Sequence, residues 1–310
     1  MTKMRTRFLV LGMAILGMFV YSCGGSGSSS NTSGSLDQAC SDLANAECQK
    51  VNSCSSFLLK FLYGNIATCE ARDKLGCMAG ISADGVTVTP SQIEACVSAT
   101  SAKSCSDVWA LKDACHLNGS LPDGSACGSG NQCQSGYCKI PWGKTCGVCT
   151  AKATAGANCM SVWECASGLI CAGGQCKTPG AAGALCSDSQ PCRSDLYCNN
   201  GTCAKPATSA GTPCDSSILT SCSIISGLYC PESGVCKNIQ LVPGGSSCGL
   251  GTSCEGGGVC KQKSPDALSG TCVSPVADGQ HCDASQSLYC MSPATCVSGQ
   301  CVLPNPLACN

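Results

Sequence analysis

The feature that most constrains this chain is a four-cysteine unit that recurs through its C-terminal part. Each copy opens with the pattern Gly-x-x-Cys, and successive opening cysteines are 27 to 34 residues apart. The six opening cysteines are Cys127, Cys159, Cys186, Cys214, Cys248 and Cys282. A spacing that recurs in this range is typical of repeat arrays. We therefore predict a linear array of six disulfide modules over residues 121–310.

The cysteine content predicts where such a chain is stable. The 310 residues include 35 cysteines, whereas only 4% are aromatic and 12% are charged. Units of this length cannot bury a large apolar core, so disulfides have to supply their stability. Disulfides persist in an oxidising compartment, such as the periplasm or the cell exterior. We therefore expect an exported protein with a small disulfide-rich fold.

The N-terminus has the pattern of an export signal. Lys3, Arg5 and Arg7 precede an apolar stretch of 14 residues, 8–21, which is the length of a signal-peptide core. We predict a signal peptide over residues 1–22. The following sequence, Val-Tyr-Ser-Cys-Gly, resembles the lipobox of bacterial lipoproteins, and this resemblance implies that Cys23 carries lipid. Residues 23–35 are rich in glycine and serine and are expected to form a flexible tether.

Residues 36–120 have a helical pattern and form the second predicted part. Ser35 precedes Leu36 as a helix cap, and apolar residues and cysteines then recur at spacings of three to five. Further helices are expected before Gly64, from residue 66 to a stop at Gly76, after Thr89-Pro90, and over residues 104–115. We predict a bundle of four or five short helices. Its eight cysteines are even in number, so all of them can pair within the bundle.

Within the array, we predict that each unit ends in a small hairpin. Glycine stands two positions before the last cysteine in most units, as in Asn-Gly before Cys203, and supplies the positive φ angle of a tight turn. The segments between units, 177–183, 204–211 and 273–279, contain the proline and alanine of extended spacers.

Two patterns of disulfide pairing, here called frames, are possible for the array. Both join the first cysteine of each unit to the third, as Cys127–Cys138, Cys159–Cys171, Cys186–Cys198, Cys214–Cys230, Cys248–Cys260 and Cys282–Cys296. In one frame the second cysteine pairs with the fourth of the same unit. In the other, the last cysteine of each unit bonds the second cysteine of the next, which leaves no orphan and makes a stiff rod. The interlocked bonds are Cys149–Cys165, Cys176–Cys192, Cys203–Cys222, Cys236–Cys254 and Cys272–Cys290, with Cys133–Cys146 and Cys301–Cys309 at the ends.

Several chemistries are disfavoured by the sequence. From Cys23 onward the chain has 15 basic and 19 acidic residues, so nucleic acid is not an expected partner. No motif for nucleophilic, zinc or phosphate chemistry occurs, and we predict no cofactor, metal or catalytic residue. One Cys-x-x-Cys, at Cys146 and Cys149, leaves a thiol-disulfide oxidoreductase as an alternative. A protease inhibitor is the second alternative, because stiff disulfide loops suit that function.

Aromatic residues mark two kinds of candidate position. Tyr137, Tyr197, Tyr229 and Tyr289 each stand just before a cysteine and are expected to cover the neighbouring disulfide. A ladder of binding sites is the alternative for these tyrosines. Trp142 and Trp163 are the better candidates for an exposed contact with a partner.

The order of these parts resembles a known group of proteins. A lipobox, a Gly/Ser tether, a helical cysteine domain and Gly-x-x-Cys units are similar to the cysteine-rich lipoproteins of myxobacteria and related Gram-negative bacteria, which carry Dickkopf N-terminal-like repeats. The resemblance implies an outer-membrane lipoprotein but transfers no activity. We expect a non-enzymatic interaction or structural protein of the envelope, held to the membrane by lipid on Cys23. Its expected partner is another envelope or extracellular protein or a glycan.

Overall fold

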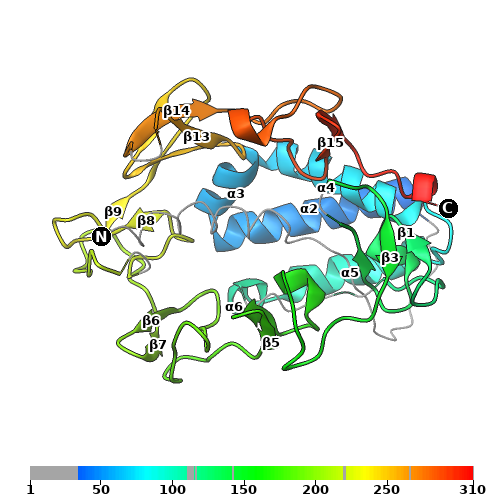
Figure 1. Cartoon of the computed structure of the whole chain (residues 1–310), viewed down its shortest axis with the longest axis horizontal. Helices are drawn as coiled ribbons and strands as arrows, with labels where there is room; N and C mark the ends of the chain where they lie inside the picture. The colour runs from blue at the N-terminus through cyan, green and yellow to red at the C-terminus, as the bar shows by residue number, and fades with distance from the viewer. Residues whose placement is uncertain are drawn as a thin grey trace.

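The computed structural model describes residues 34–109, 115, 117–141, 143–218, 221–264 and 267–309. Helices occupy its N-terminal part, and small antiparallel hairpins follow (Figure 1). All 34 cysteines from Cys40 to Cys309 are paired in 17 disulfides. The predicted fold class, a disulfide-linked helical bundle followed by hairpin modules, is confirmed. Cys23 and the predicted signal peptide lie outside the described residues.

Most of the helix boundaries follow the capping residues. The helices are α2 (Leu36–Cys54), α3 (Ser56–Tyr63), α4 (Ile66–Ile81), α5 (Pro90–Ala102) and α6 (Cys105–Trp109). Ser35 caps α2 by accepting a hydrogen bond from the Gln38 amide, and Thr89 forms a reciprocal capping box with Gln92 at the start of α5. The predicted starts at these two positions are confirmed.

The expected stop at Gly76 is wrong, because α4 continues through it to Ile81. A glycine within a helix costs only about 1 kcal/mol. Cys77 and Ile81 offset that cost, since both side chains are buried in the main core of the bundle. At the other end of the bundle, the described part of the predicted helix 104–115 is α6, and residues 110–114 lie outside the described ranges.

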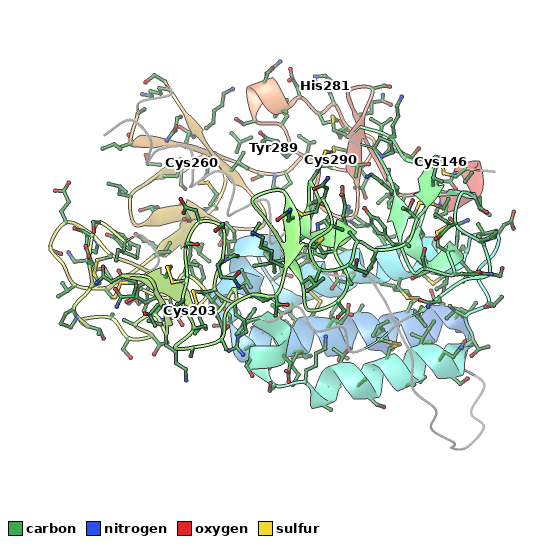
Figure 2. The ribbon with its side chains drawn as sticks, turned by 60° about the horizontal axis from the view of Figure 1, so that its bottom comes forward. Cys146, Cys203, Cys260, His281, Tyr289 and Cys290 are labelled. Atoms are coloured by element: carbon green, nitrogen blue, oxygen red, sulfur yellow. A yellow bond between two sulfur atoms is a disulfide. The ribbon has the colours of Figure 1, made fainter. Side chains whose placement is uncertain are left out.

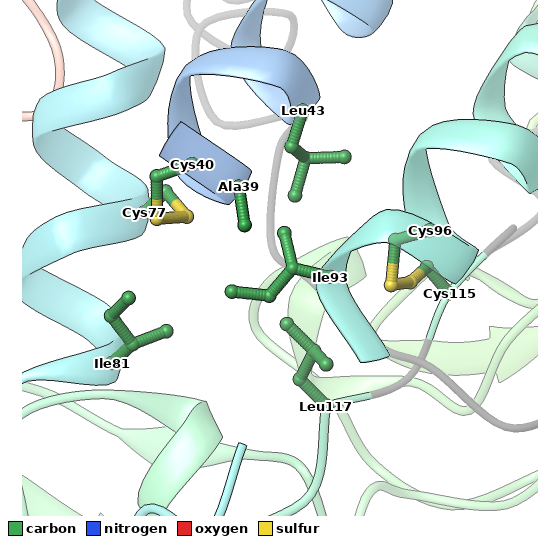
Figure 3. Packing of buried hydrophobic residues seen from close by; sticks show 9 residues of the cluster. All are labelled: Ala39, Cys40, Leu43, Cys77, Ile81, Ile93, Cys96, Cys115 and Leu117. Atoms are coloured by element: carbon green, nitrogen blue, oxygen red, sulfur yellow. A yellow bond between two sulfur atoms is a disulfide. The ribbon is translucent and has the colours of Figure 1, made fainter. Parts of the chain in front are cut away.

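Two small clusters form the core of the helical part. The first joins α2, α4 and α5 and surrounds Leu43 and Ile93, both of which are fully buried (Figure 3). The second packs Leu58, Leu59 and Leu62 of α3 against Val51. Four disulfides tie these helices together and use all eight cysteines of the bundle, namely Cys40–Cys77, Cys48–Cys69, Cys54–Cys105 and Cys96–Cys115.

The array consists of six modules, numbered 1 to 6, over residues 121–150, 151–177, 178–204, 205–238, 239–273 and 274–309. Strands are short in all of them. Modules 1 to 3 contain β1 (Ala126–Cys127), β2 (Cys138–Lys139), β3 (Gly147–Cys149), β4 (Ile170–Ala172), β5 (Gln175–Lys177), β6 (Tyr197–Asn199) and β7 (Thr202–Ala204). Modules 4 to 6 contain β8 (Leu228–Tyr229), β9 (Lys237–Asn238), β10 (Gln240–Val242), β11 (Ser247–Gly249), β12 (Thr252–Cys254), β13 (Val259–Gln262), β14 (Ser269–Val273), β15 (Thr295–Val297) and β16 (Gln300–Val302). Single 3₁₀ turns are η1 (Gly130–Gln132), η2 (Val162–Glu164), η3 (Ala284–Gln286) and η4 (Pro306–Cys309).

One hydrogen-bond pattern explains why every module opens with Gly-x-x-Cys. In module 2 the Gly156 amide donates to the Cys176 carbonyl at 2.8 Å, and the Cys176 amide donates to the Ala157 carbonyl at 2.9 Å. The equivalent pair of bonds occurs in each of the other five modules. The opening glycine has a positive φ angle in all six, +85° at Gly156, which side chains other than glycine rarely adopt. The motif therefore joins the start of a module to its last cysteine.

The segments between modules are not free spacers, contrary to the sequence-based expectation. Ala153, Gly180, Ala207 and Val276 each form a parallel bridge with the second cysteine of the module that they open, and β10 pairs with β12 in the same way. Segments 177–183, 204–211 and 273–279 thus supply hydrogen bonds to the modules in which they end. Their proline and alanine residues fit an extended strand as well as they fit a spacer, so composition alone did not separate the two.

The disulfides follow the in-module frame. The six bonds from first to third cysteine are present, and the second cysteine bonds the last of the same module. These second bonds are Cys133–Cys149, Cys165–Cys176, Cys192–Cys203, Cys222–Cys236, Cys254–Cys272 and Cys290–Cys301. The interlocked frame is therefore wrong for Cys149–Cys165, Cys176–Cys192, Cys203–Cys222, Cys236–Cys254, Cys272–Cys290, Cys133–Cys146 and Cys301–Cys309. The physical reason is the Gly-x-x-Cys hydrogen bonds, which hold the last cysteine inside its own module.

Candidate interaction surface and closure of the module ring

The two cysteines left over by the in-module frame bond each other. Cys146 of module 1 pairs with Cys309 at the end of module 6, with 5.3 Å between their Cα atoms and 163 residues between them in sequence. The modules follow one another round the helices, and the C-terminal turn returns to β1 (Figure 1). We call this closed arrangement the ring. The array is therefore not the stiff rod that the interlocked frame implied.

The ring also separates the two cysteines of the Cys-x-x-Cys motif. Cys149 bonds Cys133, whereas Cys146 bonds Cys309. Residues 147–149 form strand β3, in which each residue advances the chain by about 3.3 Å. Positions three apart on a strand are thus about 10 Å apart, beyond the Cα separation of roughly 4.4 to 6.8 Å that a disulfide needs. The redox pair expected under the oxidoreductase alternative is not formed.

Module 6 is attached to the helical bundle through Arg72 of α4. Its guanidinium donates two hydrogen bonds to the Asp278 carboxylate, at 2.6 and 2.9 Å. It donates two more to the carbonyl oxygens of Ser292 and Met291, both at 2.7 Å. The Arg72 side chain is 13% exposed and the Asp278 side chain 31%, so this ion pair is partly shielded from water.

Module 5 caps the C-terminal end of α3 with glycine amides. The amides of Gly256 and Gly257 donate to the carbonyl oxygens of Lys60 and Phe61, at 2.9 and 2.7 Å. These carbonyls belong to the last turn of the helix, where few local donors remain, although the Lys60 carbonyl also accepts from the Gly64 amide. Gly64 lies directly against Gly256, so the absence of side chains on both allows the backbones to meet.

Modules 1, 3 and 4 make further contacts with the bundle. In module 1 the Gln132 side-chain amide donates to the Asp84 carbonyl at 2.9 Å. Ser194 of module 3 donates to the Trp109 carbonyl. Ser55, at the junction of α2 and α3, donates to the Ile225 carbonyl of module 4. Five modules therefore contact the helices through hydrogen bonds.

The helical bundle keeps an open groove between α2 and α5. Helix α2 contributes Asp42, Asn45, Ala46, Gln49, Lys50 and Ser53, and α5 contributes Glu94, Val97 and Ser101. The groove has a volume of about 540 Å³, and no residue of the array is among these lining residues. The two helices lie along one side of the molecule in Figure 2, and none of the described module residues is drawn beneath them. This groove is the candidate interaction surface.

Charge in the groove is mixed. Partial burial and the nearby Asp42 carboxylate raise the pKa of Glu94. The Lys50 ammonium donates to the Lys103 carbonyl at 3.0 Å, which fixes a positive charge at one end. Carboxylates, amides and hydroxyls thus line the groove together, and these groups exchange hydrogen bonds with hydroxyl-rich or peptide ligands.

A buried acid lies elsewhere in the bundle and was missed by the sequence reasoning. Asp73 of α4 is 8% exposed and accepts a hydrogen bond from the Tyr63 hydroxyl at 3.1 Å. Burial raises the pKa of Asp73 to about 7, although the Tyr63 hydrogen bond opposes the shift. Burial and the Asp73 carboxylate raise the pKa of Tyr63 in turn. The helical spacing of Cys69 and Asp73 was the available signal, because it places both on one face of α4.

The aromatic candidates fall into different environments. Trp142 lies outside the described residues, and Trp163 is half-buried in η2. Tyr229 packs against Gly251 of the next module, where a methyl group would lie 2.4 Å from the Tyr229 hydroxyl oxygen. Burial raises the pKa of Tyr137 in module 1, and the Glu164 carboxylate of module 2 raises it further. At least these two tyrosines therefore lie at junctions between modules.

Sulfur atoms gather in threes at the centres of the modules, as with Cys159, Cys165 and Cys176, within 4.8 Å of one another. This grouping has the size of a metal site. Cys159 bonds Cys171, however, and Cys165 bonds Cys176, so the sulfurs are already in covalent disulfides. The triads are the cores of the modules.

These features define a disulfide-rich protein of small modules, a fold consistent with a structural or interaction role. Its many disulfides indicate an oxidising environment, extracellular or periplasmic. No helix in the described ranges combines the length and the apolar character needed to cross a membrane. No family model, curated protein or solved structure matches this chain.

Proposed function

We propose that this protein is a non-enzymatic lipoprotein of the cell envelope that binds a partner through the groove between α2 and α5. The observation that carries the proposal is the position of the groove, on the helical bundle and outside the contacts made by the ring. The ring stabilises the bundle from the other sides, so the groove is presented on a rigid frame. Rigid presentation lowers the entropy lost on binding.

The anchoring part of the proposal comes from the sequence. The lipobox-like site at Cys23 and the Gly/Ser tether of residues 23–35 resemble those of the cysteine-rich lipoproteins. We infer that a lipid on Cys23 holds the protein at the outer membrane. The partner is another envelope or extracellular protein or a glycan, because amide, carboxylate and hydroxyl side chains line the groove.

A binding experiment with matched variants tests the groove. A soluble form beginning at Gly34 keeps the Ser35 cap of α2 and can be applied to envelope proteins and arrayed glycans. Gln49→Ala with Glu94→Ala removes one amide and one charge from the groove. Lys261→Ala with Gln262→Ala removes one amide and one charge, of the opposite sign, from the exposed end of strand β13. We expect the groove variant to lose binding by about tenfold or more and the β13 variant to bind normally. Equal binding by both variants would refute the groove.

One observation also favours protease inhibition as a second candidate. Met160 is 88% exposed and directly follows Cys159, which is fixed by its bond to Cys171. The next residue, Ser161, is extended, with φ −142° and ψ 160°. An exposed apolar side chain on a pinned, extended loop fits the apolar pocket of a serine protease. Incubation with chymotrypsin-like proteases tests this candidate: slow cleavage at Met160 with inhibition, lost in Met160→Asp, would support it, and rapid cleavage without inhibition would exclude it.

A further inference from the structure

The Cys146–Cys309 bond differs from the other disulfides in what it holds together. The remaining 16 lie within the helical bundle or within one module, and their partners are 11 to 51 residues apart. Cys146–Cys309 joins module 1 to module 6 across 163 residues. We propose that this bond is a site of thiol-disulfide exchange, at which a dithiol opens the ring while every module stays folded.

Loss of this bond leaves both modules with their own cores. Module 1 retains Cys127–Cys138 and Cys133–Cys149, and module 6 retains two bonds in the same frame. The core of module 1 consists mainly of its cysteines, since Cys127 and Cys133 are fully buried and the packed cluster contains four sulfurs. Reduction of a core disulfide therefore removes the core itself, whereas reduction of Cys146–Cys309 removes none.

The two sulfurs of the bond differ in access. Cys146 is partly exposed and follows the exposed Lys144, whereas Cys309 is 5% exposed. Cys146 lies next to the C-terminal turn at the edge of the molecule (Figure 2). An incoming thiolate therefore reaches the sulfur of Cys146 first, and the Lys144 ammonium favours its negative charge.

The exchange balances with a dithiol as the only co-reactant. A thiolate of the dithiol attacks Cys146 Sγ, the bond to Cys309 breaks, and its electron pair leaves on Cys309 Sγ, which takes a proton. The second thiol of the dithiol then attacks the other sulfur of the same dithiol, which is bonded to Cys146 Sγ in the mixed disulfide. Cys146 is released as a thiol and the dithiol becomes a cyclic disulfide, so one disulfide is reduced and one is formed.

Opening the bond frees the C-terminal turn from module 1. The turn η4 packs on Gly128, where a methyl group would lie 2.6 Å from Pro306 Cα and 3.0 Å from Cys309 Sγ. Modules 1 and 6 stay attached to the bundle through Gln132 and Arg72. The change is thus confined to the seam between β1 and η4, where Leu307 is already 51% exposed.

Graded reduction of the intact mature protein tests the proposal. Samples are titrated with dithiothreitol under native conditions, alkylated, and analysed by mass spectrometry for the labelled fraction at each cysteine. We expect Cys146 and Cys309 to be labelled together, at a dithiol concentration roughly tenfold below that for any core cysteine, with helical circular dichroism unchanged. Proteolytic cleavage within residues 303–308 should appear with the same midpoint.

Two further variants make each outcome decisive. Cys105 is exposed, whereas Cys146 is partly exposed, and removal of the Cys54–Cys105 bond by Cys54→Ser with Cys105→Ser should leave the Cys146 titration unchanged. Cys146→Ser with Cys309→Ser should be cleaved within 303–308 without any reductant. Labelling of core cysteines at the same or lower dithiol concentration would overturn the proposal. So would a double variant as resistant to cleavage as the oxidised protein.

Discussion

The Arg72 guanidinium and the Asp278 carboxylate form a two-pronged ion pair between helix α4 and module 6, with donor-acceptor distances of 2.6 and 2.9 Å. The residues are 206 positions apart in sequence. Arg72 also binds two carbonyl oxygens of the same module, so one side chain fixes both the position and the orientation of that module.

Replacing Arg72 by alanine should loosen module 6 and destabilise the folded chain by about 2 to 3 kcal/mol, because Asp278 and the Ser292 carbonyl lose the Arg72 donor and the Met291 carbonyl keeps only the Ala294 amide. Hydrogen exchange of residues 276–297 and urea unfolding measure the two effects. Lys74→Ala is the matched control, since Lys74 pairs with Asp37 at a more exposed site. Equal effects of the two changes would contradict the role of Arg72.

The buried Asp73 makes stability depend on pH. Its pKa is about 7 in the folded chain, above the usual value of 3.8, because burial disfavours the charged form. Between these values the unfolded chain has released the proton and the folded chain still holds it, so stability falls as pH rises from about 4 to 7. The expected loss is a few kcal/mol at most.

Asp73→Asn should remove most of this fall, because the amide oxygen still accepts from Tyr63 but does not ionise. Urea unfolding at pH 4, 5.5, 7 and 8 measures the slope for both proteins. Asp84→Asn is the control, because it removes an acid other than Asp73. A wild-type slope that survives Asp73→Asn would show that other groups, such as Glu47, cause it.

Two glycines should respond to alanine in opposite directions. Gly156 has φ +85° with open space round its Cα, so Gly156→Ala should cost about 1 to 2 kcal/mol through backbone strain alone. Gly76 lies within α4, and an added methyl would meet Pro293 at an ordinary 3.8 Å. Gly76→Ala should therefore stabilise the chain by up to about 1 kcal/mol. Thermal melts of the two variants under oxidising conditions measure both changes, and destabilisation of equal size would contradict this explanation.

The proposed lipid on Cys23 predicts both a thiol count and a location. With 34 cysteines paired, titration of the denatured, unreduced protein should find close to no free thiol. Cys23→Ala should move the protein from the membrane fraction to the soluble fraction, as followed by immunoblot. Ser22→Ala is a neighbouring control that should stay with the membrane. Retention of the Cys23 variant in the membrane would refute the lipid anchor.

Local features of this fold were predictable from the sequence, and long-range ones were not. Ser35, Thr89 and the Gly-x-x-Cys repeats act through hydrogen bonds to residues nearby in sequence or within the same module, so each leaves a pattern. The choice between Cys192–Cys203 and Cys176–Cys192 was open because the two loops, of 11 and 16 residues, differ little in closure entropy. Only the backbone hydrogen bonds made by Gly183 and Cys203 decide in favour of Cys192–Cys203.

Neither the closure of the ring nor the presence of the groove left such a pattern in the sequence. Arg72 and Asp278 are ordinary surface residues when each is considered in its own segment. The contact of Gly64 with Gly256 depends on two glycines whose roles are visible only when the segments meet. Sequence spacing likewise could not show that Cys309 bonds Cys146, because the path of the array round the bundle sets that distance.

The closed ring has an evolutionary consequence. Open repeat proteins gain and lose units readily, because each unit contacts only its neighbours. Here each module spans a fixed arc, five of the six form hydrogen bonds with their own places on the helical bundle, and the last must end where Cys309 meets Cys146. Deleting or duplicating one module would shift every later contact and separate these two sulfurs. Descendants of this chain should therefore vary in loop length within modules while the number of modules stays at six.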